Sequence, residues 1–380
     1  MDDRITPKQI KNVNKKIIYD YLYSRREKGT TQQEISNALT MSRPTVAGKL
    51  TELEDEGLIY EDGIIETSQF GRKPSAWYVR PDYKIAVGVE ILKHIVRITA
   101  INLYGQELKT VKKLIEYENS GEYYEKICVE VKNFVKNFQR KILGIGFALQ
   151  GLVSKDGKTI IYGEILKCTG MKIDVFSSRL DFPCRFMHEP DGAALAELWA
   201  SPTLKSAIYL SMSEHLGGAL ISNRKILNGT HRHSATFEHI QAVHDGELCY
   251  CGKTGCYETV CSKVALLNGE KPDEFFHKVR ANEPDASQRW GKFLRYLGKL
   301  IAALHLMVDT KYILGGHLAP YFTEDDIKIL YEEIRERNAF SSIESDDYIL
   351  LSKMPSNNIT IGAALPYVIK FLENFGSEKN

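Results

Sequence analysis

A histidine and three cysteines lie close together in the C-terminal half of the chain, in the pattern His239-x9-Cys249-x-Cys251-x4-Cys256. One imidazole and three thiolates are the donors of a closed tetrahedral zinc site, and four protein ligands leave no position open for a catalytic water. We therefore predict that these four residues bind a structural Zn²⁺ ion. His244 is an alternative fourth ligand.

The alternative to a metal site is a set of buried thiols beside a hydrogen-bonded histidine. The chain has seven cysteines, an odd number, and crowding of this kind favours a metal over disulfides in a reducing compartment. The cysteines that we expect to be ordinary core residues are Cys128, Cys168, Cys184 and Cys261. No apolar run is long enough to span a membrane, and residues 1–16 lack the apolar segment of a signal peptide. We expect a cytoplasmic protein.

A second group of chemically suited residues lies near the N-terminus, at the start of a predicted helix and in a basic segment between a glycine and a proline. These candidates for DNA contact are Ser42, Arg43, Thr45, Lys49, Arg72 and Lys73. Arg43 can bind a guanine through two hydrogen bonds, and the basic segment suits a narrow A·T-rich minor groove. A net charge of +1 means that any DNA-binding charge must be arranged locally.

The elements that must position these residues are three helices and a hairpin. Apolar residues at helical spacing predict a helix over residues 10–22. Thr31 and Glu34 form the capping box of a helix over 32–39, and Ser42 caps a third helix with Pro44 in its first turn. Strand-like runs at 58–61 and 75–80 follow. This order is that of a winged helix-turn-helix, which predicts DNA binding; the alternative is a small helical protein-interaction domain.

The rest of the chain alternates between strands and helices, which indicates an α/β architecture with layered sheets. The β-branched, apolar segments that we predict as strands are 83–91, 94–104, 142–149, 206–213, 218–222 and 312–316. The segments that we predict as helices are 121–139, 193–199, 285–307 and 323–337.

Together these features resemble the ROK family (repressors, open reading frames and kinases), in particular its xylose-repressor-like branch. The segments that carry the resemblance, besides the zinc pattern, are 42–45, 71–74, 143–151, 194–197, 229–231, 255–258 and 314–316. The resemblance implies a winged helix-turn-helix at 1–81, then an actin-like ATPase fold with lobes at 82–198 and 199–380 and a final helix that packs back on the first lobe. It also implies a sugar cleft between the lobes and a homodimer or homotetramer.

Kinases of this family bind phosphates with glycine-rich loops, and both loops are altered here. The first corresponds to residues 90–94, Glu-Ile-Leu-Lys-His, whose bulky side chains would fill the phosphate space. In the second, Glu214 would repel a triphosphate. The general base of the family corresponds to Glu189 or, in an alternative alignment, to Asp191. We therefore expect no enzymatic activity.

The resemblance also assigns an effector site that is altered relative to the family. Its candidate residues are His188, Glu189, Asp191, His231, Thr236, His239 and Glu258. The sugar-contacting motif E-x-G-H corresponds to Thr236-Phe237-Glu238-His239, so the contacting glutamate is replaced by threonine. Either the cleft binds a different ligand, such as a modified or acidic sugar attracted by His188, His231, Arg232 and His233, or it binds no effector.

These observations predict a sequence-specific transcriptional repressor that binds a double-stranded DNA operator and controls carbohydrate-related genes in response to a sugar or sugar-derived effector. Two alternatives stay open. One is an active sugar kinase with an attached DNA-binding domain, and the other is a repressor that responds to a partner protein.

Overall fold

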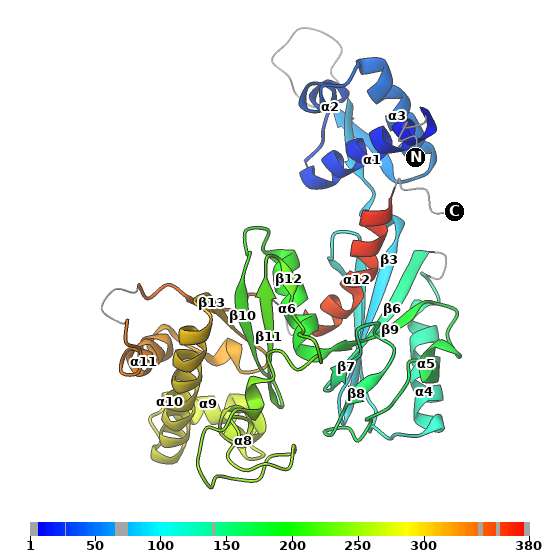
Figure 1. Cartoon of the computed structure of the whole chain (residues 1–380). Helices are drawn as coiled ribbons and strands as arrows, with labels where there is room; N and C mark the ends of the chain where they lie inside the picture. The colour runs from blue at the N-terminus through cyan, green and yellow to red at the C-terminus, as the bar shows by residue number, and fades with distance from the viewer. Residues whose placement is uncertain are drawn as a thin grey trace.

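The computed structural model describes residues 7–26, 28–64, 75–138, 141–340, 345–354 and 358–375. Three bodies are visible in Figure 1: a small N-terminal unit of three helices and a hairpin, and two lobes that each contain a β-sheet. The N-terminal unit lies beyond one end of the first lobe, and the second lobe lies beside the first.

The N-terminal unit contains α1 (Pro7–Arg25), α2 (Gln32–Leu39), α3 (Arg43–Asp55) and an antiparallel pair of strands, β1 (Ile59–Ile64) and β2 (Ser75–Val79). Both predicted helix starts are present. The Thr31 side chain accepts from the backbone N–H of Glu34 at 3.2 Å, and the Glu34 carboxylate accepts from the backbone N–H of Thr31 at 2.7 Å. The Ser42 hydroxyl accepts from the backbone N–H of Thr45 at 3.3 Å. Local hydrogen bonds therefore define where α2 and α3 begin.

The first lobe is built on a mixed five-stranded sheet with the order β5-β4-β3-β6-β9. Its strands are β3 (Ile85–Ile91), β4 (Ile95–Asn102), β5 (Glu107–Leu114), β6 (Ile142–Leu149) and β9 (Cys184–His188). The lobe also contains η1 (Pro81–Tyr83), α4 (Gly121–Val135), α5 (Asp174–Ser177) and the hairpin β7 (Leu152–Val153) and β8 (Ile160–Tyr162). β3 and β4 are antiparallel, whereas β3, β6 and β9 are parallel to one another.

The second lobe repeats this topology, with the order β12-β11-β10-β13-β14. Its strands are β10 (Ala207–Met212), β11 (Leu216–Ser222), β12 (Lys225–Ile226), β13 (Lys311–Gly315) and β14 (Ile349–Leu351). Its helices are η3 (Phe237–His239), α7 (Glu258–Cys261), α8 (Lys263–Leu267), α9 (Pro272–Arg280), α10 (Pro284–Met307), η4 (Ala319–Tyr321) and α11 (Glu324–Arg335). As in the first lobe, one central strand pairs antiparallel on one side and parallel on the other.

Two helices, α6 (Glu189–Ala200) and α12 (Asn358–Asn374), pack against each other between the two sheets. α12 packs on the first sheet, and glycines allow the close approach. A Cβ atom on Gly88 of β3 would overlap the carbonyl oxygen of Thr360, and a Cβ atom on Gly362 would overlap that of Gly192 in α6. The backbones of β3, α12 and α6 therefore form one tightly packed layer.

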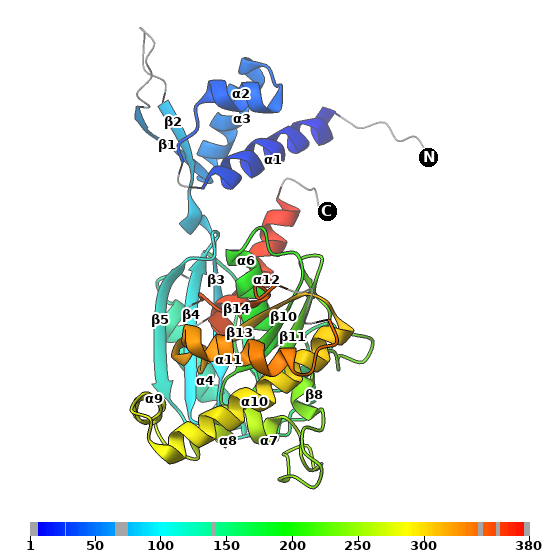
Figure 2. The same ribbon diagram turned by 90° about the vertical axis from the view of Figure 1, so that its left-hand side faces the viewer.

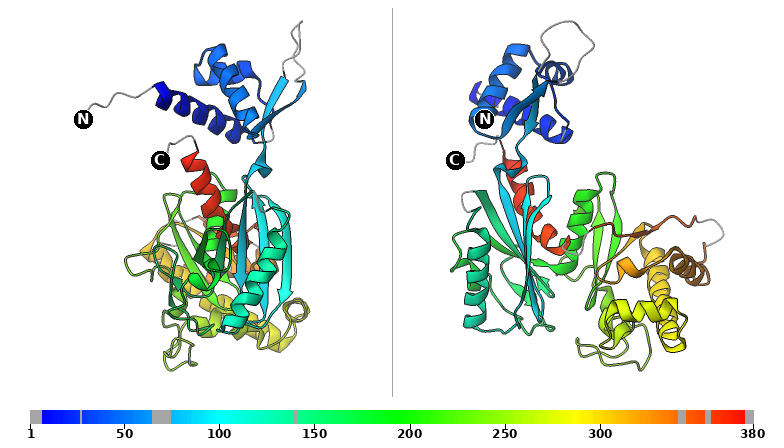
Figure 3. Two further views of the ribbon diagram at one scale, coloured as in Figure 1. Left: turned by 90° about the vertical axis from the view of Figure 1, so that its right-hand side faces the viewer. Right: turned by 180° about the vertical axis from the view of Figure 1, so that it is seen from behind.

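The C-terminal end of α12 contacts α1 of the N-terminal unit, as the turned views in Figures 2 and 3 also show. The rings of Tyr19 and Phe375 lie 4.5 Å apart, and Lys16 Nζ donates to the carbonyl oxygen of Leu372 at 2.7 Å. Tyr19 is fully buried. A chain of packed helices thus connects the space between the lobes with the N-terminal unit. None of the described helices is both long and apolar enough to span a bilayer.

Candidate functional site

The predicted metal ligands converge at one point of the second lobe. The side-chain donor atoms of His239, Cys249, Cys251 and Cys256 all lie within 4.8 Å of one another. In a tetrahedral site with Zn–S bonds of about 2.3 Å, neighbouring sulfur atoms are about 3.8 Å apart. The Sγ atoms of Cys251 and Cys256 are 3.7 Å apart, and Cys249 Sγ lies 3.8 Å from His239 Nδ1. The donor set and its spacing therefore fit Zn²⁺.

His239 and not His244 joins the three cysteines in this cluster. His244 is exposed and pairs with the neighbouring Asp245, with 2.7 Å between Nδ1 and Oδ2. The two ring nitrogens of His239 face different groups, because Nδ1 lies near Cys249 and Nε2 lies 3.8 Å from Oε1 of Glu238. A metal on Nδ1 would leave Nε2 protonated as a hydrogen-bond donor.

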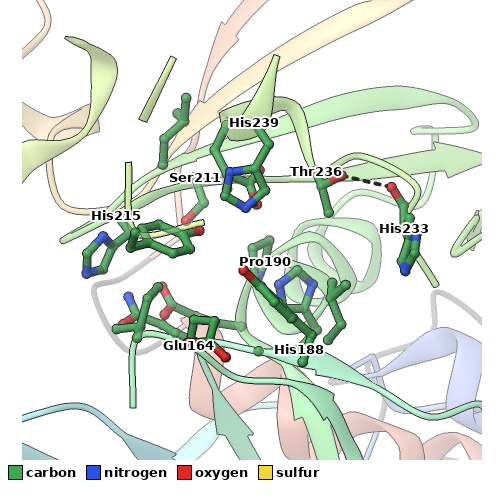
Figure 4. Close-up of a pocket in the computed structure, with 18 of the residues that line it drawn as sticks. Glu164, His188, Pro190, Ser211, His215, His233, Thr236 and His239 are labelled. Atoms are coloured by element: carbon green, nitrogen blue, oxygen red, sulfur yellow. Dashed lines mark hydrogen bonds and ion pairs between the residues drawn. The ribbon is translucent and has the colours of Figure 1, made fainter. Parts of the chain in front are cut away.

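Beside this cluster lies a cavity of about 430 Å³. Its walls come from both lobes: β7 and β8, the start of α6, the β10–β11 turn, η3 and the loop that holds the metal ligands. In Figure 4, Glu164 and His188 lie across the cavity from His239 and Thr236. Four of the predicted effector residues line it, namely His188, Glu189, Thr236 and His239.

The other predicted effector residues lie outside the lining. Asp191 is buried and accepts from Asn228 Nδ2 at 2.7 Å. Glu258 accepts from the backbone N–H of Leu216 at 2.8 Å and contacts His215 Nδ1 at 2.6 Å, so it positions a histidine that does line the cavity. His231 is exposed.

Glu189 is the first residue of α6 and is 3% exposed. Burial raises the pKa of its carboxyl to about 8, and the negative charge of Glu90 adds to the rise. Hydrogen bonds from Gln150 and Ser213 act in the opposite direction. The Oε2 atom of Glu189 has no hydrogen-bond partner among the described residues. A buried acceptor without a donor is costly unless a ligand supplies the donor.

Glu238 is a second buried carboxyl of the same kind, and our sequence reasoning did not select it. It is 6% exposed, it lines the cavity, and its Oε2 atom also lacks a partner within the described part of the chain. Burial raises the pKa of its carboxyl to about 8. The sequence feature that could have pointed to Glu238 is its position next to His239. Tyr250 also lines the cavity and was also not selected, although it stands between two predicted cysteine ligands.

The basic groups that suggested an acidic ligand do not form a cationic wall. Burial lowers the pKa of His188 to about 4, and the positive charge of Arg232 contributes, so His188 is neutral at physiological pH. Arg232 donates to the carbonyl oxygen of Val153 at 2.8 Å and lies 3.8 Å from Asp191. No lysine or arginine is among the described residues that line the cavity.

The positions that correspond to the phosphate loops are occupied by ion pairs and apolar side chains. Glu90 is buried in β3 and pairs with Arg97 at 2.5 Å, and Ile91 beside it is also buried. In the second position Glu214 pairs with Lys263. This lysine offsets much of the repulsion that Glu214 alone would exert on a phosphate, so Glu214 opposes a triphosphate less than its sequence position indicated.

The predicted DNA-contacting residues differ in accessibility. Ser42 and Arg43 are exposed at the start of α3, and Thr45 is half-buried. Lys49 is only 7% exposed, and its ammonium group lies 2.6 Å from the carboxylate of Glu52. The other two predicted contacts, Arg72 and Lys73, lie outside the described residues.

Comparison with known proteins identifies the class. A model of the ROK family matches residues 86–365, so the chain belongs to the ROK family. The xylose repressor of Bacillus subtilis (strain 168) is 23% identical over 274 residues, which cover 70% of each chain. The DNA-binding transcriptional dual regulator NagC of Escherichia coli (strain K12) is 27% identical over 300 residues, which cover 72% of this chain and 74% of that protein.

Solved structures confirm the predicted fold class. A crystal structure of a ROK family transcriptional regulator, a homolog of the E. coli MLC protein, matches with a TM-score of 0.74 and 20% identity, over 97% of this chain and 98% of that chain. A ROK family glucokinase from Streptomyces griseus, in complex with glucose and AMPPNP, matches with a TM-score of 0.67 and 20% identity. This match covers 74% of this chain and 98% of the glucokinase chain.

Proposed function

We propose that this protein is a transcriptional repressor that binds a double-stranded DNA operator and controls carbohydrate-related genes. The observation that carries the proposal is the exposed, capped start of α3 in a three-helix and hairpin unit joined to a ROK module. In this arrangement the first turn of the third helix enters the major groove. Arg43 and Ser42 are then free to contact base edges and phosphates, whereas Lys49 can contact DNA only after its ion pair with Glu52 breaks. The names of the related repressors support this function.

We further propose that a sugar or sugar-derived effector in the cavity changes the affinity for DNA. A volume of about 430 Å³ is in the range of small-molecule sites. Glu189 in the cavity wall begins α6, α6 packs on α12, and the end of α12 contacts α1 through Phe375 and Tyr19. A ligand that prefers one arrangement of the lobes would therefore bias the position of the N-terminal unit. A symmetric dimer or tetramer would pair two such units on one operator.

We propose that the chain has no sugar kinase activity. Phosphoryl transfer depends on positioning and on neutralising the charge of the phosphates. Glu90, buried and paired with Arg97, and the apolar Ile91 occupy the region where backbone amides would contact phosphates. One observation favours the alternative of an active kinase: Glu189, with its pKa raised to about 8, has the proton affinity of a general base. Assays of ATP consumption with hexoses decide between them, and turnover abolished by Glu189→Gln would establish the kinase.

The repressor function is tested by selecting DNA from a random pool with the full-length protein, and then titrating sugars against the selected site. We expect an enriched two-half-site sequence and a sugar that changes its affinity. Recovery of no enriched sequence would contradict the proposal. Enrichment without an effect of any sugar would leave a repressor that responds to a partner protein.

A further inference from the structure

The cavity has two ends of different chemical character. In Figure 4, His188, Thr236 and His233 lie toward one end, whereas Glu164 and His215 lie toward the other. All five side chains line the same cavity. The end near Thr236 carries polar groups, and the end near His215 is walled mainly by aliphatic and aromatic side chains. A ligand that fills the cavity therefore meets two different environments.

The polar end can bind the hydroxyl groups of a sugar. Glu189, next to His188, is 3% exposed, and its Oε2 atom has no hydrogen-bond partner among the described residues. Burial lowers the pKa of His188 to about 4, so its neutral ring has one donor and one acceptor. The hydroxyl of Thr236 donates to the carbonyl oxygen of His233 at 3.0 Å and keeps its capacity to accept. Sugar hydroxyls both donate and accept, so they satisfy groups of this kind.

The other end is formed by side chains from both lobes. We call it the apolar end, and its residues are Ile161, Tyr162, Ile165, His215 and Tyr250. The first three flank Glu164 in the chain, which places the first-lobe wall at this end. The rings of His215 and Tyr250 lie 5.4 Å apart in an edge-to-face arrangement, which places Tyr250 at the same end.

The apolar surface at this end is incompletely covered. Ile161 is 40% exposed, and Tyr162, Ile165 and Tyr250 are half-buried, whereas the apolar residues of the two lobe cores are almost fully buried. Burying apolar surface of this kind against an apolar group of a ligand is favourable. The apolar end therefore favours a ligand with an apolar part.

The two polar side chains at this end already have partners. The Glu164 carboxylate accepts from Lys167 Nζ at 2.7 Å, and His215 Nδ1 lies 2.6 Å from Oε1 of Glu258. A second sugar ring would compete with these partners, whereas a flat apolar group needs no hydrogen bonds. The tyrosine hydroxyls of the apolar end are the groups to which a second sugar ring would bind, so disaccharides are the informative comparison.

We propose that the cavity binds a glycoside with an aromatic aglycone, with the sugar at the polar end and the aglycone between Ile161 and Tyr250. An aromatic ring can pack one face on an aliphatic side chain and meet a tyrosine ring edge to face or in an offset stack. A volume of about 430 Å³ is in the range of sites for molecules larger than a single sugar ring. The inference rests on the proposed function only in taking this cavity as the effector site.

The test measures binding to the full-length protein without DNA, by calorimetry and by the shift in melting temperature. Glucose, galactose, xylose and N-acetylglucosamine are each compared as the free sugar, the methyl glycoside and the phenyl glycoside, with both anomers of each glycoside. Cellobiose, maltose and lactose place a second sugar ring at the position of the aglycone. We expect at least one phenyl glycoside to bind at least roughly tenfold more tightly than its methyl counterpart, because the phenyl ring leaves water.

One variant and a matched control test the apolar end. Ile161→Ser should weaken binding of the phenyl glycoside at least roughly fivefold, and should leave binding of the methyl glycoside nearly unchanged. Ile329 on α11 is 41% exposed and does not line the cavity, so Ile329→Ser should bind both glycosides as the wild type does. If Ile161→Ser does not fold, Ile165→Ser on the same wall takes its place.

Four results would overturn the inference: no binding of any phenyl glycoside at millimolar concentration, equal affinity for phenyl and methyl glycosides, full affinity for the phenyl glycoside in Ile161→Ser, or a disaccharide that binds as tightly as the phenyl glycoside of the same sugar. These results are distinguishable from failure of the proposed function. If a free sugar or a disaccharide binds and changes the affinity for DNA, without an advantage of the phenyl glycoside, the repressor proposal stands and this inference falls. If a phenyl glycoside binds as expected without affecting DNA, the inference stands and the effector role falls.

Discussion

Replacing Glu189 by glutamine should stabilise the folded protein at neutral pH and have little effect at pH 5. The pKa of the Glu189 carboxyl is raised from its ordinary value of 4.5 to about 8, chiefly by burial. Each tenfold change in proton affinity corresponds to about 1.4 kcal/mol. At a pH between 4.5 and 8 the unfolded chain releases the proton and the folded chain keeps it. The stability of the wild type therefore falls as the pH rises from 4.5 to 8.

The size of the stabilisation by Glu189→Gln follows from the difference between the two pKa values. At pH 7 the cost of keeping Glu189 in the fold is about 3 kcal/mol, and at pH 5 it is below about 1 kcal/mol. Glutamine keeps the shape and an acceptor for Gln150 and Ser213, and it does not titrate. For a lobe of this size 3 kcal/mol corresponds to a rise in melting temperature of roughly 6–12 °C.

The assay is the melting temperature of wild type, Glu189→Gln and the exposed control Glu247→Gln, each measured at pH 5 and pH 7 without sugars. We expect the melting temperatures of wild type and Glu189→Gln to differ strongly at pH 7 only, and those of wild type and the control not to differ. A variant that is equally destabilised at both pH values would refute it, because the Glu189 carboxylate would then be well paired or hydrated in the fold.

Three further outcomes are expected. Elemental analysis of protein purified without added metal should find about one zinc per chain, and Cys251→Ser should lose it; metal-free wild type that is fully folded would contradict this. Arg43→Ala should reduce base discrimination by roughly 1–3 kcal/mol in competition binding. Lys49→Ala should reduce it less, because Lys49 is already paired with Glu52. A larger effect of Lys49→Ala would reverse these roles. Phe375→Ala should lower the melting temperature of the N-terminal unit, since it removes an aromatic contact worth roughly 1 kcal/mol with Tyr19; an unchanged unfolding profile would show the contact to be unimportant.

Elements governed by short-range interactions could be predicted from the sequence. The starts of α2 and α3 follow from Thr31, Glu34 and Ser42, because a cap is a hydrogen bond within four residues. Strand β6 was predicted with its observed bounds, since its residues are continuously apolar. Strand β5 was missed, because it is a lysine-rich edge strand whose pairing with β4 supplies the order that its composition does not.

The predicted metal cluster belongs to the part that the sequence by itself indicated, since its four candidate ligands lie within eighteen residues and their chemistry allows few alternatives. The tertiary structure showed that the two sheets share one topology and which strands of the first sheet α12 contacts. That the final helix returns to the first lobe was implied only by the family resemblance. The tertiary structure also decided the character of the cavity. Glu189 and Glu238 are ordinary carboxylates in the sequence. They become buried, each with one oxygen that has no partner among the described residues, because segments nearly fifty residues apart close around one space. Burial and pairing depend on distances between remote segments, which neither spacing nor composition encodes.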